Sequence, residues 1–432
     1  VLNAVAPLAF GNGSVYEHAR NGGSIPTGAW NEGSTLLMTG TVSTAPGNRN
    51  QNYYNITFNT PKMTSNLDMG LNDATIGGNI RVENTGNVRW RLTSAAAGDT
   101  AIITIMGDVI VEAGAFETQG TGNALTVFEV HHYGNVVATG GNFSISRGSQ
   151  GNGSGSTRWY LHEGNFSISN ATTQNSNATN ARFVFDKDGV QTLALSSVTY
   201  GGGGLAIEVA GGTTLDFGVS ELGGNGLFIL NENATLATAH TGGIAGTVRS
   251  TGNVTFNAGA SYIFNGTTAQ ATSALMPATV NGLAINNSAG VVLSQATTIN
   301  GVLRLMAGEF DNTIPFMLGP NGSISFEGGR LKFTTSVDEQ VSEIPTEFAL
   351  FQNYPNPFNP STTIRYHVPK RTHVTLKIHD AMGREVAELV NGEHDAGAYD
   401  IVWAAQGLTS GVYYYRISAG DFTSVQKLVL MK

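Results

Sequence analysis

The feature that most constrains the fold of this chain is a long succession of short alternating strands that recur about every 20 residues. Between residues 34 and 333, Val, Ile, Thr, Phe and Leu alternate with polar residues in short runs, and Gly and Asn separate the runs. Starts of the form Gly-Asn or Gly-Asp, followed by alternating apolar residues, lie at Gly78, Gly107, Gly134, Gly141 and Gly164. Three later glycines, Gly282, Gly301 and Gly322, recur at nearly equal spacing.

A spacing of about 20 residues is typical of one coil of a parallel β-helix. Each coil would add one strand to each of two or three parallel sheets, with glycine and asparagine at the corners. The hexapeptide at residues 141–146 returns at residues 164–169, and we interpret the two copies as stacked repeats. An antiparallel sandwich or barrel is the alternative, but the repeat is too long for simple hairpins. The pattern therefore favours the parallel β-helix.

Composition excludes several classes of protein. Charged residues are 12% of the 432 residues, the formal net charge is −9, and there is no cysteine. A disulfide scaffold, a cysteine-ligated zinc site and a thiol enzyme are therefore excluded, and an acidic chain does not favour nucleic acid as a partner. No run of about 18 apolar residues is present, so we expect no membrane span. We interpret residues 1–10, which do not resemble a signal peptide, as a processed start or an artificial boundary.

The composition of the sequence changes near its C-terminal end. Residues 334–346 are acidic, polar and free of glycine, which indicates a linker. Residues 347–432 contain expected strands at 362–367, 373–379, 385–389, 397–403, 411–418 and 424–431, which predicts a small immunoglobulin-like β-sandwich. The chain is therefore expected to be all-β: an N-terminal cap or docking segment (1–33), a parallel β-helix or β-solenoid (34–333), a linker (334–346) and the sandwich (347–432).

A proline- and asparagine-rich run opens the last segment, with Tyr354, Pro355, Asn356, Pro357, Phe358, Asn359 and Pro360 in succession. Further motifs follow in order, at Gly383 and Arg384, at Gly411 and Tyr413, and at Lys427 and Lys432. With these motifs, residues 346–432 resemble the type A C-terminal sorting domain of the type IX (Por) secretion system. The sequence departs from that pattern at Ala404 and Ala405, where an acidic-glycine pair is common.

This resemblance implies export across the inner membrane by an N-terminal signal and across the outer membrane by the type IX translocon. It also implies a Bacteroidota-like source and an extracellular or outer-surface location, and in many members the domain is cut off after export. Residues 262–305 resemble repeats that are common in large surface proteins of that phylum. The triplet at residues 99–101 resembles the phylum's O-glycosylation acceptor, which makes Thr100 a candidate for modification.

Candidate binding residues are few. Alternation places Glu129 and His131 on one face of a strand, and Arg158, Trp159 and His162 follow about one coil later. These residues are candidates for a groove that binds a glycan by aromatic stacking and bidentate hydrogen bonds. A set of solvated or stacked surface side chains is the plainer interpretation. We identify no catalytic residue, metal-ligand set or cofactor motif, and we therefore expect a protein that is not an enzyme.

The sequence thus predicts a secreted structural protein of the cell surface. The open ends of a β-helix present unpaired strand edges, which can pair with another copy. We therefore expect a subunit of an extracellular filament or surface layer, a head-to-tail homopolymer assembled through the β-helix ends and terminal segments. The alternatives are a β-helix that binds or degrades polysaccharide, with surface glycans as partners, and a monomeric surface adhesin.

Overall fold

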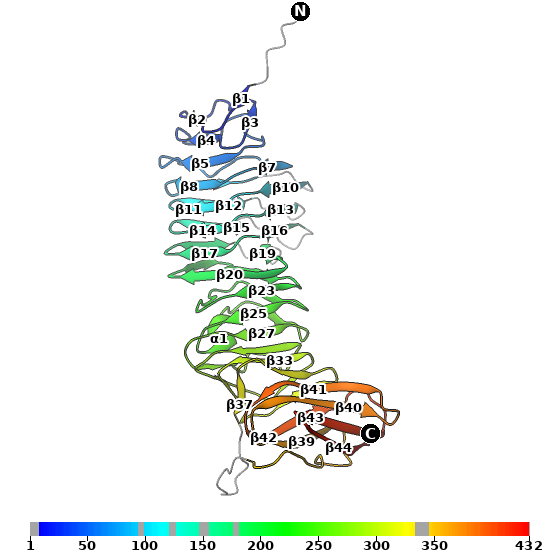
Figure 1. Cartoon of the computed structure of the whole chain (residues 1–432). Helices are drawn as coiled ribbons and strands as arrows, with labels where there is room; N and C mark the ends of the chain where they lie inside the picture. The colour runs from blue at the N-terminus through cyan, green and yellow to red at the C-terminus, as the bar shows by residue number, and fades with distance from the viewer. Residues whose placement is uncertain are drawn as a thin grey trace, which may run out of the picture. The chain divides into compact units, whose positions relative to one another are not determined.

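The computed structural model describes residues 8–93, 99–120, 127–146, 155–175, 181–332 and 345–431 (Figure 1). The chain divides into two compact units. The first unit contains Val1–Leu230 and Val248–Thr255, and the second contains Asn231–Thr247 and Phe256–Lys432.

The first unit is a parallel β-solenoid, whose strands Figure 1 shows stacked as successive rungs from blue to green. Sheet 1 contains β2 (Val15–His18), β4 (Thr35–Met38), β5 (Asn55–Asn59), β8 (Ile80–Asn84), β11 (Val109–Val111), β14 (Val136–Ala138), β17 (Phe166–Ser169), β20 (Gly189–Ser196) and β23 (Thr213–Asp216). Sheet 2 contains β7 (Ala74–Ile76), β10 (Thr100–Ile105), β13 (Val127–His132), β16 (Ser156–Leu161), β19 (Ala181–Phe185), β22 (Ile207–Val209), β24 (Phe228–Leu230) and β26 (Val254–Phe256). Sheet 3 contains β6 (Leu67–Asp68), β9 (Arg89–Arg91), β12 (Ala115–Gln119), β15 (Asn142–Ser146), β18 (Thr172–Asn175) and β21 (Thr199–Gly202).

The pairing between rungs is parallel and in register, which confirms the β-helix and excludes the antiparallel alternative for this region. The coil is not of constant length. Val15 pairs with Thr35, whereas Val109 pairs with Val136 and Val136 with Phe166, so the step from rung to rung lengthens toward the middle of this unit. A coil of about 20 residues is therefore correct for the first rungs and too short for the middle of this unit.

The repeated hexapeptide does not mark equivalent places in neighbouring coils. Its first copy forms β15 in sheet 3, and its second forms β17 in sheet 1. The two copies are alike because each carries a glycine corner followed by a strand that buries phenylalanine, Phe143 or Phe166. Our interpretation of their spacing as a stacking period was wrong, since corner chemistry recurs on every face of a solenoid.

The Gly-Asn and Gly-Asp starts at Gly78, Gly107, Gly134 and Gly164 form one corner of the first unit. At this corner, a side-chain oxygen on one rung accepts a hydrogen bond from a backbone N–H on the next rung. The Asn55 side chain accepts from the Asn79 N–H, and the Asn79 side chain accepts from the Asp108 N–H. The ladder continues on the next rungs: the Asn135 N–H donates to the Asp108 side chain at 2.7 Å, and the Asn165 N–H donates to the Asn135 side chain at 2.9 Å. A Cβ at the preceding Gly134 or Gly164 would overlap the carbonyl oxygen of the glycine one rung below. Close stacking of rungs therefore requires glycine at this corner.

Inward side chains fill the solenoid. Trp90, Phe116 and Phe143 are fully buried, and the rings of Phe116 and Phe143 stack across adjacent rungs at 6.3 Å. Each buried aromatic side chain contributes about 2–3 kcal/mol of hydrophobic stabilisation. The first described rung includes β1 (Ala9–Phe10), which pairs in parallel with β3 (Ala29–Trp30). Residues 1–33, expected to be a cap, thus contain rung structure.

The second unit begins with further parallel rungs. Its strands are β25 (Thr235–Thr238), β27 (Ser261–Phe264), β30 (Gly282–Asn286), β33 (Val302–Ala307) and β36 (Ser323–Phe326) in one sheet, β28 (Gln270–Ala271), β31 (Val291–Val292), β34 (Glu309–Asp311) and β37 (Arg330–Lys332) in a second, and β29 (Thr279–Val280), β32 (Thr297–Ile299) and β35 (Phe316–Leu318) in a third. A single short helix, α1 (Gly243–Thr247), is found among the described residues. Ser261 pairs with Gly282 and Leu283 with Leu303, so the coil here again has the predicted length of about 20 residues.

An antiparallel sandwich follows, as the sequence predicts. Its strands are β38 (Ala349–Leu350), β39 (Ser361–Val368), β40 (Thr372–Asp380), β41 (Glu385–His394), β42 (Gly397–Ala404), β43 (Gly411–Ala419) and β44 (Phe422–Leu430). Residues 333–344, most of the expected linker, lie outside the described residues.

Within the second unit, the sandwich closes the last rung of the solenoid. β41 extends beyond the expected strand, and the added part pairs in parallel with β36, Ile324 with Val390 and Phe326 with Gly392. Leu318 of β35 likewise pairs with Trp403 of β42. The backbone edges of β36 and β35 that a final coil would expose are therefore covered by the sandwich.

Candidate functional site

A cluster of polar and aromatic side chains lies on the outward side of sheet 2. Alternation in β13, β16 and β19 sends every second residue outward, and register stacks these residues in columns. We call this cluster the histidine–arginine face: Glu129, His131, Tyr133, Arg158, Tyr160, His162, Arg182, Asp186 and Glu208. In one column, Glu129, Arg158 and Arg182 are register partners on successive rungs.

Two imidazoles on this face connect two carboxylates. Nδ1 of His162 lies 3.0 Å from Oδ1 of Asp186, and Nε2 of His162 lies 3.0 Å from Nδ1 of His131. Nε2 of His131 lies 3.8 Å from Oε2 of Glu129. A carboxylate accepts, so the proton of neutral His162 belongs on Nδ1, and its Nε2 then accepts from Nδ1–H of His131. This arrangement leaves Nε2 of His131 as an imidazole nitrogen that carries no proton. Burial raises the pKa of Asp186, and the contact with the His162 imidazole opposes that shift.

Aromatic rings and guanidinium groups surround these two imidazoles and two carboxylates. His131 stacks on Tyr160 at 5.1 Å, and Tyr133, which is 40% exposed, packs against His162 at 4.9 Å. Arg182 pairs with Glu208 at 2.8 Å. Burial, and then the neighbouring charge of Arg182, lower the pKa of Arg158. The face thus offers hydrogen-bond donors, acceptors and one accessible ring.

Four of the five residues expected in a glycan groove lie together on this face: Glu129, His131, Arg158 and His162. Trp159 does not, because alternation turns it into the core, where it is fully buried and its Nε1 lies 3.3 Å from Nδ1 of His132. An indole in that position cannot stack on a sugar at the surface. Thr100, the candidate for modification, is exposed at the start of β10.

The groove predicted from the sequence did not include the remaining members of the face, Tyr133, Tyr160, Arg182, Asp186 and Glu208. The two tyrosines were within reach, since Tyr133 alternates with His131 and Tyr160 alternates with Arg158. The others lie on the next two rungs, and finding them requires the coil length at each step. The step from Arg158 to its partner Arg182 is shorter than the step from Glu129 to Arg158, so no constant repeat leads from one to the next.

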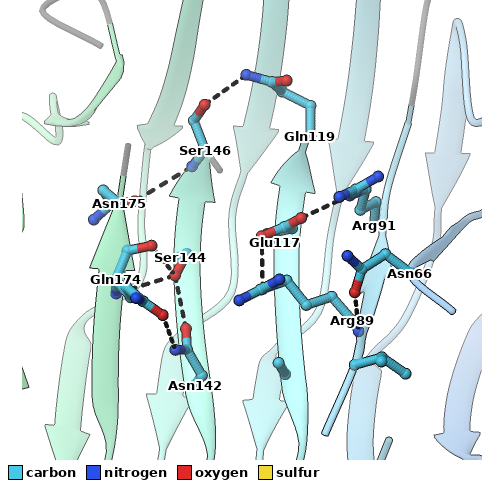
Figure 2. Close-up of polar contacts among 12 residues, drawn as sticks. Asn66, Arg89, Arg91, Glu117, Gln119, Asn142, Ser144, Ser146, Gln174 and Asn175 are labelled. Carbon is cyan, nitrogen blue, oxygen red and sulfur yellow. Dashed lines mark hydrogen bonds and ion pairs between the residues drawn. The ribbon is translucent and has the colours of Figure 1, made fainter. Parts of the chain in front are cut away.

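Sheet 3 carries a second polar cluster, drawn in Figure 2. Glu117 is fully buried, and its carboxylate lies 3.3 Å from Nε of Arg89 and 2.6 Å from Nε of Arg91. On the neighbouring rungs, Gln119 donates to Ser146 at 2.6 Å, and the Ser146 N–H donates to Asn175. These groups bond from rung to rung, so the cluster ties rungs together and offers little to a ligand.

The proline-rich run of the sandwich covers the edge of β44. The Asn356 amide donates to the carbonyl of Lys427 at 3.1 Å and accepts from the N–H of Val429 at 2.9 Å. The backbone of Phe358 bonds Val429 and Met431, and its buried ring lies 5.8 Å from that of Trp403. Tyr354 is 81% exposed beside this crossing. The remaining members of the run, Pro355, Pro357, Asn359 and Pro360, lie at the surface.

The later motifs of the sandwich are also placed. Gly383 has a φ of +80° in the turn before β41, and Arg384 bonds Asp380 at 2.8 Å across that turn. Gly411 begins β43, Tyr413 is buried with its hydroxyl donating to Thr409, and Lys427 lies on β44 at the surface. Lys432 lies outside the described residues.

Residues 352–431 match the family model described as a secretion system C-terminal sorting domain. Searches of curated proteins and of solved structures found no match for the chain. In the part of the chain that the structure describes, no helix is long and apolar enough to span a membrane, and no group of three or more His, Asp or Glu side chains is arranged to hold a metal ion.

Proposed function

We propose that this β-solenoid protein, which its type IX secretion sorting domain directs to the cell surface or extracellular space, is a structural subunit that assembles with other copies of itself. The assembly is an extracellular filament or surface layer, and its function depends on shape and association instead of catalysis. We likewise propose a Bacteroidota source, on the resemblance of the sorting domain.

The observation that supports self-association is that some strand edges are covered by a neighbouring strand and others are not. In the described residues, β2 has one strand partner, β4, and β1 has one, β3, so their other edges carry unpaired backbone groups. Val15 and Leu8 are 60% and 48% exposed at these strands. Such an edge favours pairing with another chain. In the second unit, by contrast, β41 covers β36, so the edge of β36 is not available for stacking of a further rung.

The proposal is tested with the full chain in sedimentation velocity and electron microscopy at increasing protein concentration. We expect concentration-dependent oligomers or filaments, and we expect Val15→Lys to suppress them, because charge on an edge strand opposes pairing. Val190→Lys is the matched control, since Val190 is 59% exposed on β20, which has partners on both sides. Monomers at every concentration, or equal assembly of both variants, would contradict the proposal. A monomer that adheres to surfaces would favour the adhesin.

A second candidate function is polysaccharide binding on the histidine–arginine face. The carboxylates, guanidinium groups and exposed Tyr133 ring of this face are groups that recognise hydroxyls and the apolar side of a sugar. The test is binding of the full chain to polysaccharide-coated surfaces, with Arg182→Ala and Tyr133→Ala as the weakened variants. Unchanged binding by both variants would remove this candidate.

A further inference from the structure

A separate cavity lies beyond the histidine–arginine face, where β20 passes into β21. It has a volume of about 610 Å³ and is bounded by the end of β20, by β21, by the loop between β23 and β24, and by Arg249. All of these residues belong to the first unit. Its chemistry comes from Ser196, Ser197, Tyr200, Val219, Glu221 and Arg249. The volume is in the range of pockets that bind small organic ligands.

The Tyr200 ring is held by the glycines behind it. A Cβ on Gly223 would lie 3.0 Å from a ring carbon of Tyr200, and a Cβ on Gly224 would lie 2.9 Å from the Tyr200 Cβ. Only glycine lets the ring lie this close to the neighbouring backbone. The hydroxyl donates to the Glu221 carbonyl at 3.2 Å, which fixes the ring in its plane. Tyr200 therefore presents a rigid aromatic surface to the cavity.

A charged pair and two hydroxyls complete the cavity. Arg249 donates to the Glu221 carboxylate at 2.6 Å, and the Arg249 N–H bonds the Leu222 carbonyl at 2.9 Å, which anchors the residue to the loop. The guanidinium has five N–H donors, so this pair still offers donors beside carboxylate acceptors. Ser196 and Ser197 are exposed, and Ser197 has a φ of +53°, a left-handed conformation unusual for serine.

We propose that this cavity binds a sugar ring of a neutral polysaccharide. Sugar rings have an apolar face that stacks on an aromatic ring and hydroxyls that both donate and accept. The Tyr200 ring supplies the first contact, and the Arg249–Glu221 pair and the serine hydroxyls supply the second. The pair carries no net charge, which favours a neutral sugar over a phosphate or uronate. The inference does not depend on self-association or on the histidine–arginine face.

The test is calorimetric titration of the full chain with cellohexaose, xylohexaose, mannohexaose, chitohexaose and, as an acidic probe, hexagalacturonate. We expect saturable binding of at least one neutral probe. Tyr200→Ala and Arg249→Ala should each weaken it about tenfold or more, while Tyr200→Phe, which keeps the ring, should stay within about threefold. Tyr414→Ala is the control, since Tyr414 is an exposed tyrosine of the sandwich that lies outside both the cavity and the histidine–arginine face.

Two results would overturn the proposal: no binding of any neutral probe, or binding that survives both Tyr200→Ala and Arg249→Ala. Loss of binding in Tyr133→Ala or Arg182→Ala, with Tyr200→Ala unaffected, would place the sugar on the histidine–arginine face. That outcome overturns the cavity and supports the second candidate function. Arg249 is 59% exposed, so its replacement tests binding without removing core packing.

Discussion

At the scale of single residues, the Glu117 carboxylate depends strongly on its ion-pair partners. It is fully buried between Arg89 and Arg91, whose side chains are 22% and 20% exposed. Removing one partner of a buried ion pair leaves the other charges poorly solvated and costs about 3–5 kcal/mol, whereas an exposed pair contributes about 0–1 kcal/mol. Burial of the carboxylate therefore decides how much this cluster contributes to the free energy of unfolding.

We expect Glu117→Ala to lower the free energy of unfolding of the first unit by about 3 kcal/mol, because it strands two guanidinium groups. Trp90, fully buried on the same strand as both arginines, provides the fluorescence signal in a urea titration. Glu112→Ala, which removes an exposed pair with Arg81 in the same unit, is the control and should change stability by less than about 1 kcal/mol. Equal effects of both changes would show that burial is irrelevant here.

Buried histidines make stability depend on pH. His132 is fully buried; its Nε2 donates to the Gly107 carbonyl at 2.7 Å and its Nδ1 accepts from Trp159. Burial lowers the pKa of His132 from 6.5 to about 4, and burial also lowers the pKa of His394 to about 3. Both side chains are therefore neutral in the folded protein at pH 7.

The folded pKa of His132 lies below its unfolded value, so the unfolded chain binds the proton first as the pH falls. Stability is full above about pH 6.5 and decreases toward pH 4, by on the order of 3 kcal/mol. We expect His132→Gln, which keeps a donor and an acceptor, to flatten this dependence in denaturation measured from pH 7 to pH 4. A slope unaltered by His132→Gln would contradict the assignment.

At the scale of secondary-structure elements, the sorting motif protects an edge strand. The side chain of Asn356 bonds the backbone of β44 as a neighbouring strand would, and the Phe358 backbone continues that pairing. The motif therefore has a structural role inside the sandwich, whatever the translocon contacts.

We expect Asn356→Ala to cost about 1–2 kcal/mol, because two backbone groups of β44 lose their partner. Amide hydrogen exchange should show faster exchange at Val429, whose N–H the Asn356 side chain accepts. The control is Asn359→Ala, an exposed asparagine of the same motif. Unchanged protection of Val429 in Asn356→Ala would refute this role.

At the scale of the whole molecule, the sandwich has a second task besides export. Its β41 completes the sheet that ends in β36, and a Cβ on Gly392 would lie 2.9 Å from the Phe326 nitrogen, so the contact is close. Without the sandwich, β36 would be an unprotected edge.

A chain that ends at residue 332 should therefore self-associate more strongly than the full chain, as measured by sedimentation velocity. The same truncation with Ser325→Lys should associate less, because a lysine on an edge strand opposes pairing; Ser325 lies on β36, opposite Asn391 in the full chain. If the truncated chain stays as soluble and monomeric as the full chain, the pairing of β41 with β36 is not what prevents self-association at that edge.

The sequence alone determined what depends on neighbouring residues. Alternation identified the six long strands of the sandwich, and glycine followed by asparagine identified the corners. The motifs around Pro355 and Gly383 identified the sorting domain. These signals are local, because side chains alternate every two residues and a corner needs only one glycine.

Only the tertiary structure decided which strands meet. The coil length changes from rung to rung, so a sequence repeat could not show that β15 and β17 lie on different sheets, or that Asp186 reaches His162. It could not foresee that Trp159 faces the core, that β41 closes the solenoid, or that Tyr200 and Arg249 share a cavity. Contacts between rungs depend on the length of every intervening turn, and a turn can gain residues without altering the strand pattern on either side.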